Sequence, residues 1–322
     1  MKIQTHAYTI LTILTVLSAL LAACGGSAST PASGDLQGNL TISGAWALYP
    51  MMTRWAEEFQ KLHPDVTFDV SAGGAGKGMA DALGGAVDIG MVSRDVNPEE
   101  EANGAYWVAV TKDAVFVTLS DKNPVLQDLL KLGVRHDDFV KIYITGEITT
   151  WGELVGKPEI TDEIHVFTRS DACGAAETWA KYLGKKQEDL LGVAVFGDPG
   201  VLDAVIKDPL GIGFNNLNYA FDMASAKPVA GAAVLPIDNN ENGIADPDEL
   251  LETKGEAVQV VADGKYPSPP ARALNLVTKG KPTGLVQAFI EWILVEGQKF
   301  VGEAGYVQLT QEQLEESLQK VR

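Results

Sequence analysis

The feature that most constrains the fold is a repeated alternation of short predicted strands with predicted helices. Strands separated by helices are typical of parallel βαβ units, so we expect an α/β protein. Three turns rich in glycine and other small residues each stand between a strand and a helix. They read SGAWALYP (43–50), AGGAGKGM (72–79) and RSDACGAA (169–176).

The expected elements follow from hydrophobic periodicity. Trp55, Phe59 and Leu62 recur at helical spacing, which predicts a helix that begins at Tyr49 or Pro50. Short apolar or alternating segments predict strands over 39–43, 65–71, 87–92, 114–119, 164–168, 211–216 and 273–278. After the last strand we expect one long amphipathic helix. Its apolar stripe is formed mostly by Leu285, Phe289, Ile293, Leu294 and Phe300.

The three turns predict a binding site for an anion. In open α/β sheets, ligands bind at the carboxyl ends of the strands, where helices begin. The unpaired N–H groups of one helix start carry about half a positive charge, so three converging starts would hold an oxyanion without a metal. Arg169 in the third turn adds a charged donor. The alternative is that all three are ordinary tight turns.

The N-terminus predicts export. Residues 10–23 form a largely apolar run that is shorter than the about 20 residues of a membrane span but suits the core of a secretory signal. The sequence LAAC that ends at Cys24 resembles the lipobox of bacterial lipoproteins, which implies a signal peptide over 1–23 and a lipid on Cys24. The alternative is an ordinary signal with a chance cysteine. Residues 24–38 are small and polar, as in a flexible tether.

Charge limits the partners of the folded part. The formal net charge of −18 argues against nucleic acid and against an anionic membrane surface. The membrane is therefore expected to be a partner only through the lipid anchor. The charge does not exclude an anionic ligand, because surface charges are screened over about 8 Å at physiological salt.

Cys173 raises the possibility of an enzyme. The chain has two cysteines, so with Cys24 lipidated no intramolecular disulfide is available. A cysteine beside Arg169 at a helix start can have a lowered pKa, as in cysteine hydrolases. Such a nucleophile also needs a base and an orienting group, and no histidine forms a recognisable pair with Cys173. We therefore expect a protein that is not an enzyme.

Several segments resemble the phosphate-binding proteins of phosphate ABC transporters. The resemblance rests on the following segments: YPMMTRWAEEFQKLHPDVTFDVSAGGAGKG, GGAVDIGMVSRD, DKNPV, ITGEITTWGEL and EAGYVQL. It implies a type II periplasmic-binding-protein fold, in which two α/β lobes joined by two crossover strands close over the ligand. Lobe one would comprise residues 39–112 plus 268–322, and lobe two residues 113–267.

The resemblance also implies which residues meet the ligand, and several depart from the family pattern. Ala45, Trp46 and Ala47 stand where the family usually has a serine or threonine, and Ala75 stands before Gly76 where it has a serine. Arg169 is kept, but Cys173, Gly174 and Ala175 replace a Ser-Gly-Thr run. Ser93 stands where the family has serine or aspartate, and Lys77 and Arg94 are further candidate donors.

The missing hydroxyls leave the ligand open. A lost hydrogen bond to a charged group costs about 1.5–3 kcal/mol, so several losses could exhaust a micromolar affinity of roughly 8 kcal/mol. Three alternatives remain. The ligand is phosphate or a related oxyanion, or a partly organic anion that packs on Trp46, or the chain is a sensor or scaffold whose cleft binds no solute.

A second candidate site reads DNNENGIADPDE (238–249) and has the spacing of an EF-hand calcium loop. One departure from the pattern is Ala245, and a strand rather than a helix is expected before the loop. The alternative is a polar surface turn. The expected ligands are Asp238, Asn240, Asn242, the backbone carbonyl of Ile244, Asp246 and Glu249. We expect calcium to play a structural part in lobe two.

Together, these features predict a lipid-anchored, extracytoplasmic solute-binding protein. It would act as a monomer, capture a small anion between its lobes and deliver it to an ABC permease. Ligand binding would stabilise the closed form, which the permease recognises.

Overall fold

The computed structural model of the chain describes residues 36–322. The predicted signal peptide, the lipidation site Cys24 and most of the predicted tether lie outside these residues. Within the described part, no helix is long and apolar enough to cross a membrane.

The core of the structure is a mixed sheet with the strand order β2-β1-β3-β11-β4-β8-β6-β7, and β9 pairs with β4. Its strands are β1 (Gly38–Gly44), β2 (Val66–Ala72), β3 (Ile89–Val92), β4 (Ala105–Ser120), β6 (His165–Arg169), β7 (Val193–Val195), β8 (Gly211–Asn216), β9 (Ala232–Val234) and β11 (Ala271–Lys279). β1 pairs in parallel with β2 and β3, and β6 pairs in parallel with β7 and β8. The expected parallel βαβ units are therefore present.

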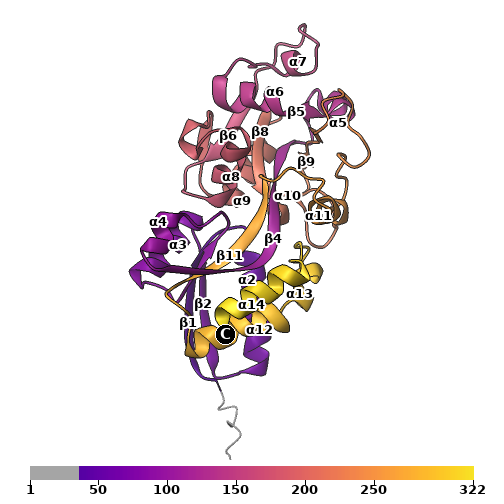
Figure 1. The fold of residues 1–322 in the computed structure, drawn as a ribbon. Helices are drawn as coiled ribbons and strands as arrows, with labels where there is room; N and C mark the ends of the chain where they lie inside the picture. The colour runs from indigo at the N-terminus through magenta and orange to yellow at the C-terminus, as the bar shows by residue number, and fades with distance from the viewer. Residues whose placement is uncertain (1–35) are drawn as a thin grey trace, which may run out of the picture. The chain divides into compact units, whose positions relative to one another are not determined.

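Strand β4 joins two lobes. Residues 105–114 of this strand pair with β11, and residues 115–119 pair with β8, in both cases antiparallel. Lobe one holds β1, β2 and β3, whereas lobe two holds β6, β7 and β8. Figure 1 shows β4 and β11 running between the two lobes. The predicted fold class, two α/β lobes joined by two crossover strands, is confirmed.

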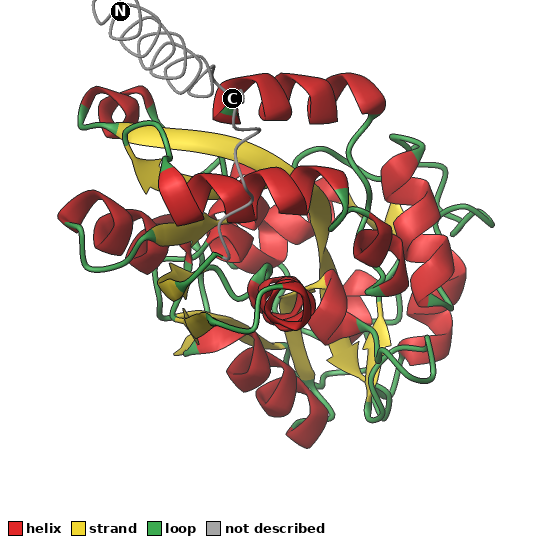
Figure 2. Ribbon diagram, turned by 90° about the horizontal axis from the view of Figure 1, so that it is seen from below, coloured by secondary structure: helices red, strands yellow, loops and turns green. Residues whose placement is uncertain are grey.

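Helices lie on both sides of the strands (Figure 2). They are α2 (Tyr49–Leu62), α3 (Ala75–Gly84), α4 (Pro98–Ala102), α5 (Leu126–Leu132), α6 (His136–Val140), α7 (Trp151–Leu154), α8 (Gly174–Tyr182), α9 (Gly197–Lys207), α10 (Leu217–Ala220), α11 (Lys254–Ala262), α12 (Gly284–Val295), α13 (Lys299–Glu303) and α14 (Gln311–Val321). The short strands β5 (Val134–Arg135) and β10 (Ile237–Asp238) form a separate two-stranded sheet.

The prediction of one long helix after β11 was wrong, because the chain forms α12 and α13 with a break between them. At the break, a Cβ on Gly297 would lie 2.8 Å from the Cα atom of Ile293, so only glycine fits. The side chain of Gln298 donates to the carbonyl of Ile293 at 3.1 Å, and Trp55 donates to the carbonyl of Gly297 at 2.9 Å. These contacts satisfy carbonyls that a continuous helix would have bonded internally.

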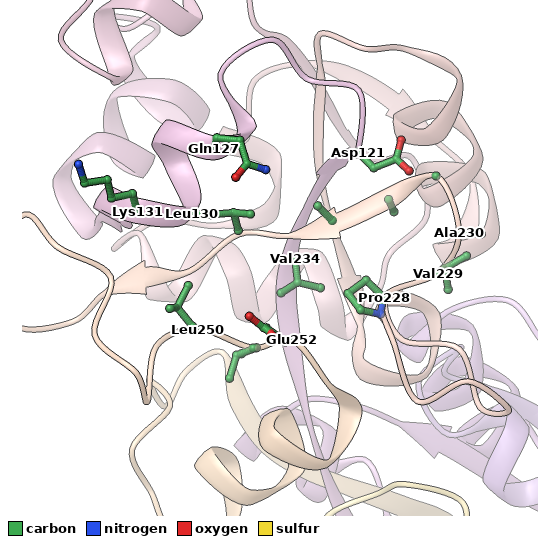
Figure 3. Close-up of a pocket in the computed structure, with 14 residues that line it drawn as sticks. Asp121, Gln127, Leu130, Lys131, Pro228, Val229, Ala230, Val234, Leu250 and Glu252 are labelled. Carbon is green, nitrogen blue, oxygen red and sulfur yellow. The ribbon is translucent and has the colours of Figure 1, made fainter.

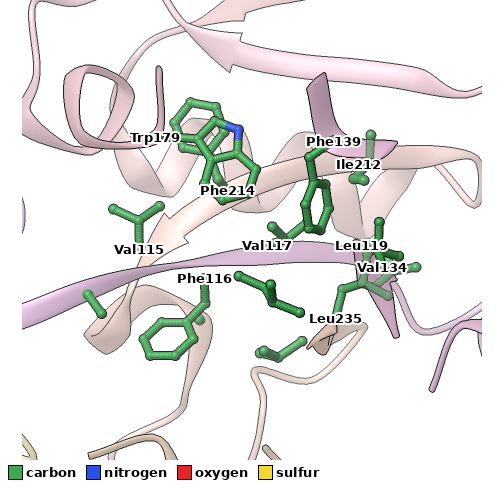
Figure 4. Packing of buried hydrophobic residues seen from close by; sticks show 14 of the residues in the cluster. Val115, Phe116, Val117, Leu119, Val134, Phe139, Trp179, Ile212, Phe214 and Leu235 are labelled. Atoms are coloured by element: carbon green, nitrogen blue, oxygen red, sulfur yellow. The ribbon is translucent and has the colours of Figure 1, made fainter. Parts of the chain in front are cut away.

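Lobe two is built around an aromatic core that fixes α8 in place. Figure 4 shows Phe139 and Trp179 on one side of β4 and Phe116 on the other. Trp179 of α8 is fully buried, and its ring stacks on Phe214 of β8 with 6.1 Å between the ring centres. The third predicted turn leads into the N-terminal end of α8. The packing of Trp179, further along the same helix, therefore holds this end in place.

Lys254 at the start of α11 is a buried cation that links lobe two to lobe one. Its Nζ atom donates to the side-chain oxygen of Asn218 and, at 3.2 Å, to the carbonyl of Ala304 after α13. Burial lowers the pKa of Lys254 to about 8, from the 10.5 of an unperturbed lysine. Between these pH values the unfolded chain binds a proton here that the folded chain has lost, so a rise in pH favours folding.

We expect this effect to depend on Lys254. The free energy of unfolding of the wild type, minus that of Lys254→Met, should increase from about pH 7 to about pH 9.5, with a slope of no more than about 1.4 kcal/mol per pH unit. Urea denaturation of both proteins at fixed ionic strength measures this difference. A difference that stays constant across the range would contradict the assignment.

Candidate functional site

The first and second predicted turns meet in lobe one. The carbonyl of Gly44, at the end of β1, accepts hydrogen bonds from the N–H groups of Gly73 and Gly74 at 2.9 and 3.0 Å. The N–H of Ala45 donates to the carbonyl of Met91 in β3 at 2.9 Å. The carboxyl ends of β1, β2 and β3 therefore bring residues 45–47, 75–76 and 93 to one edge of the sheet, as the parallel pairing requires.

The third turn, in lobe two, touches this edge across the space between the lobes. The N–H of Gly76 donates to the carbonyl of Ala172 at 3.0 Å. Gly174 packs so closely on Ser93 that a Cβ at this position would lie 2.2 Å from the Ser93 carbonyl oxygen. All three turns and Ser93 thus converge between the lobes.

Arg169 lies at this junction with its side chain completely buried. Its Nε and Nη2 atoms donate to the two carboxylate oxygens of Asp171 at 2.8 and 2.7 Å, and Nη1 donates to Asp198 at 2.7 Å. A guanidinium has five N–H donors. Three are used, so one N–H on each terminal nitrogen has no partner among residues 36–322.

Asp171 and Asp198 were not among the predicted site residues. Asp198 is fully buried and is the second residue of α9, directly after a fourth strand-to-helix turn. The sequence FGDPG (196–200) is rich in glycine and stands where a strand leads into a helix, as the other three turns do, so this pattern could have pointed to Asp198. Burial lowers the pKa of Arg169, but the neighbouring acidic groups, with Asp198 first and Asp171 among the others, together outweigh burial and the pKa is raised. The guanidinium therefore stays charged.

Backbone N–H groups supply the other donors at the junction. No acceptor among residues 36–322 receives a hydrogen bond from the N–H of Ala75, Gly174 or Ala175, which begin α3 and α8. The methyl groups of Ala45, Ala47, Ala75 and Ala175 are buried. The side chains at the junction are therefore apolar at positions where the resemblance implies hydroxyls, and the polar donors come from the helix starts and Arg169.

Trp46 reaches from lobe one to lobe two. Its ring meets Phe196 edge-on with 5.9 Å between ring centres, and a Cβ on Gly197 would lie 3.1 Å from the indole. Tyr219 donates to the carbonyl of Trp46 at 3.4 Å. Trp46 is only partly buried, so it acts as a contact between the lobes and not as a residue of the core of lobe one.

Arg94 and Lys77, the other two candidate donors, are paired with carboxylates. Arg94 forms an ion pair with Glu100 at 2.7 Å and with Glu177 of α8, across the lobes, at 3.0 Å. Lys77 pairs with Asp81 of its own helix. Neither cation is free to serve as the main anion donor.

Cys173 has a structural role at the start of α8. Its sulfur accepts the N–H of Ala176 at 3.4 Å, as an N-cap residue does. Burial raises the pKa of the Cys173 thiol to about 12, so the reactive thiolate is disfavoured. His165 is paired with Asp208 at 2.6 Å. These contacts support no cysteine hydrolase.

The predicted calcium loop folds on itself. The carboxylate of Asp238 accepts the N–H groups of Asn242 and Gly243 at 3.1 and 2.8 Å, and Glu249 accepts those of Asn239 and Asp246 at 2.7 and 3.0 Å. Within residues 36–322 there is no group of three or more histidine, cysteine, aspartate or glutamate side chains arranged to hold a metal. The calcium site stays a prediction.

A separate pocket of about 630 Å³ lies in lobe two. It lies between β9 and α5, and residues 250–252 complete the wall, as Figure 3 shows. None of the predicted anion-site residues lines it. The pocket is therefore distinct from the junction of the turns.

The chain is similar in sequence to known binding proteins. A family model described as a PBP superfamily domain matches residues 29–296. Phosphate-binding protein PstS of Bacillus subtilis is 30% identical over 302 residues, which cover 90% of this chain and 90% of that protein. Phosphate-binding protein PstS of Methanocaldococcus jannaschii is 25% identical and covers 87% of this chain and 85% of its own. Both are binding proteins and not enzymes, in agreement with the prediction.

Solved structures agree. A putative phosphate ABC transporter substrate-binding protein from Clostridium perfringens, solved with bound phosphate, has a TM-score of 0.69 and 25% identity. It covers 85% of this chain and is itself covered completely. An ABC-type phosphate transport receptor from Vibrio cholerae, with a TM-score of 0.60 and 19% identity over 84% of this chain and 100% of its own, supports the fold alone. The chain therefore belongs to the PBP superfamily, in the family of phosphate-binding proteins of ABC transporters.

Proposed function

We propose that the chain captures phosphate between its lobes and delivers it to an ABC permease. The observation that carries this proposal is the convergence of unused donors from both lobes. Arg169 has two free N–H groups, the start of α3 offers Ala75, and the start of α8 offers Gly174 and Ala175. Paired guanidinium donors and helix starts both suit a tetrahedral oxyanion.

The same arrangement explains how binding would be signalled. Donors on α3 belong to lobe one, and donors on α8 and Arg169 belong to lobe two, so a bound anion bridges the lobes. A ligand that contacts both lobes binds the closed form better than the open form and shifts the population toward closure. The permease would then recognise the closed form. No residue of the site needs to carry out chemistry.

Calorimetric titration of the purified protein with phosphate at fixed calcium tests the proposal. We expect a dissociation constant in the micromolar range or tighter, which would mean that backbone N–H groups and Arg169 replace the missing hydroxyls. Absence of binding at millimolar phosphate would overturn it. In that case two other hypotheses would be favoured over phosphate capture. One is a partly organic anion that packs on Trp46, and the other is a sensor that binds no ligand.

We also propose that the mature protein is anchored outside the cytoplasm by lipid on Cys24. The support is the sequence LAAC (21–24) followed by a polar tether. Mass spectrometry of the N-terminal peptide should find a lipid-modified cysteine as its first residue. A Cys24→Ser variant should leave the membrane fraction. An unmodified N-terminus, or a variant that stays in the membrane fraction, would contradict the anchor.

Calcium binding by residues 238–249 is a further proposal, supported by the ligand spacing. We expect calcium to raise the melting temperature of the wild type. In Glu249→Gln, calcium affinity should fall about ten-fold or more, because the bidentate carboxylate at the last position is lost. Calorimetric titration with calcium measures the affinity.

The matched control is Glu252→Gln, which removes an exposed carboxylate three residues beyond the loop. This variant should bind calcium as the wild type does. A wild type without any response to calcium, or equal affinities in the wild type and Glu249→Gln, would rule out the loop assignment.

A further inference from the structure

We propose that Arg272, on crossover strand β11, is a positioning residue that holds the anion donors of both lobes in register. The inference rests on the proposed function and deepens it, because it says which residue couples ligand capture to closure. No sequence motif singles out this arginine.

The guanidinium of Arg272 contacts both lobes at the strand that joins them. Its side chain is 7% exposed. Nε donates to the carbonyl of Ser93 in lobe one at 3.1 Å, and Nη2 donates to the side-chain oxygen of Asn216 at the end of β8 in lobe two. Nη1 pairs with Asp113, on the other crossover strand β4, at 3.3 Å.

From Asn216 the contacts continue to Arg169. The N–H and the side-chain amide of Asn216 donate to the two carboxylate oxygens of Asp198 at 2.9 and 2.8 Å. Asp198 in turn accepts Nη1 of Arg169 at 2.7 Å. Asn216, Asp198 and Arg169 are 2%, 0% and 4% exposed, so this path of hydrogen bonds is shielded from water along its length.

On the lobe-one side, Ser93 is the residue on which Gly174 packs. Arg272 therefore holds the carbonyl group that forms the lobe-one wall beside the start of α8. Through Asn216 and Asp198 it also holds the guanidinium of Arg169, the charged donor of the proposed site. Buried polar networks specify one arrangement because each unsatisfied member is costly. A shift of the lobes that breaks the contact between Arg272 and Ser93 would therefore change the position of the Arg169 guanidinium.

The effect of Arg272 on ligand capture should exceed any effect on folding. Without the guanidinium, Asn216 and Asp113 lose a donor, so Asn216 holds Asp198, and through it Nη1 of Arg169, less firmly, while Asp171 still holds Nε and Nη2. We expect phosphate affinity to fall about ten-fold or more in Arg272→Met, because preorganised donors are replaced by mobile ones. Arg272→Lys keeps the charge and one or two donors, and should recover part of the loss.

The experiment is calorimetric titration of phosphate into the full-length wild type and the variants Arg272→Met, Arg272→Lys, Asn216→Ala and Arg272→Met/Asn216→Ala. Arg135→Met is the matched control, since Arg135 is half-exposed and forms its ion pair with Asp138 of lobe two. If Arg272 acts through Asn216, the double variant should bind no more weakly than the weaker single variant. The control should bind as the wild type does.

The outcomes separate the inference from the proposed function. A wild type that binds no phosphate overturns the proposed function, and this inference with it. A wild type that binds, together with an Arg272→Met variant of equal affinity, overturns the inference alone. Fully multiplicative losses in the double variant, or no recovery in the folded Arg272→Lys variant, also overturn it, because a purely structural arginine would give either result.

Discussion

Replacement of Arg169 by methionine is expected to abolish phosphate binding. The two free N–H groups of this guanidinium are the charged donors at the junction of the turns, and hydrogen bonds to charged groups contribute about 1.5–3 kcal/mol each. The change also leaves Asp171 and Asp198 without their cation, which adds negative charge beside the ligand. We expect an affinity loss of about 1,000-fold or more in calorimetric titration.

Folding of the variant needs a control, because two buried carboxylates lose their partner. Arg169→Lys keeps one positive charge between Asp171 and Asp198 but cannot present paired donors. It should fold, as judged by its melting temperature, and still bind phosphate about 100-fold more weakly than the wild type. Wild-type affinity in a folded Arg169 variant of either kind would remove this residue from the site.

Substitution of Gly174 by alanine is expected to prevent closure without harming the fold. A Cβ at this position would lie 2.2 Å from the carbonyl oxygen and 2.3 Å from the hydroxyl oxygen of Ser93, which belongs to the opposite lobe. Gly174 is the first residue of α8 and its φ is not positive, so alanine is compatible with the local backbone. The clash can be relieved only by separating the lobes.

We expect phosphate affinity to fall about 100-fold in Gly174→Ala, equivalent to about 2.7 kcal/mol, while the melting temperature of the ligand-free protein stays the same or rises. Gly84→Ala is the matched control, because no atom lies within 4 Å of its added Cβ. It should bind phosphate normally. If Gly174→Ala binds as tightly as the wild type, the lobes do not meet at Ser93 in the bound state.

Much of the fold could be predicted from the sequence because its elements are locally encoded. The turns at 43–50, 72–79 and 169–176 lie between strands and helices as expected, and parallel pairing brings them together. The break between α12 and α13 was missed because its cause is tertiary. Gly297 faces Ile293 and Trp55, and no proline marks the interruption.

The candidate site could be predicted only in part. Arg169 stands out in sequence as a charged residue in a glycine turn, and Asp171 and Asp198 belong to turns of the same kind, but nothing in the sequence pairs them with Arg169. Asp198 lies 29 positions from Arg169, and Arg272 reaches the same network from a crossover strand. These pairings form because the strand ends meet in three dimensions, and no local pattern in the sequence encodes the pairing.

The most direct test of the central claim is a ¹H–¹⁵N NMR titration of the labelled protein with phosphate. If backbone N–H groups and Arg169 hold the anion, the amide protons of Ala75, Gly174 and Ala175 should move downfield together, and the side chain of Arg169 should respond with them. The amide of Gly76, which already donates to Ala172, should move less. Unchanged amide signals at these three residues in the presence of saturating phosphate, or changes confined to another part of the chain, would contradict the claim.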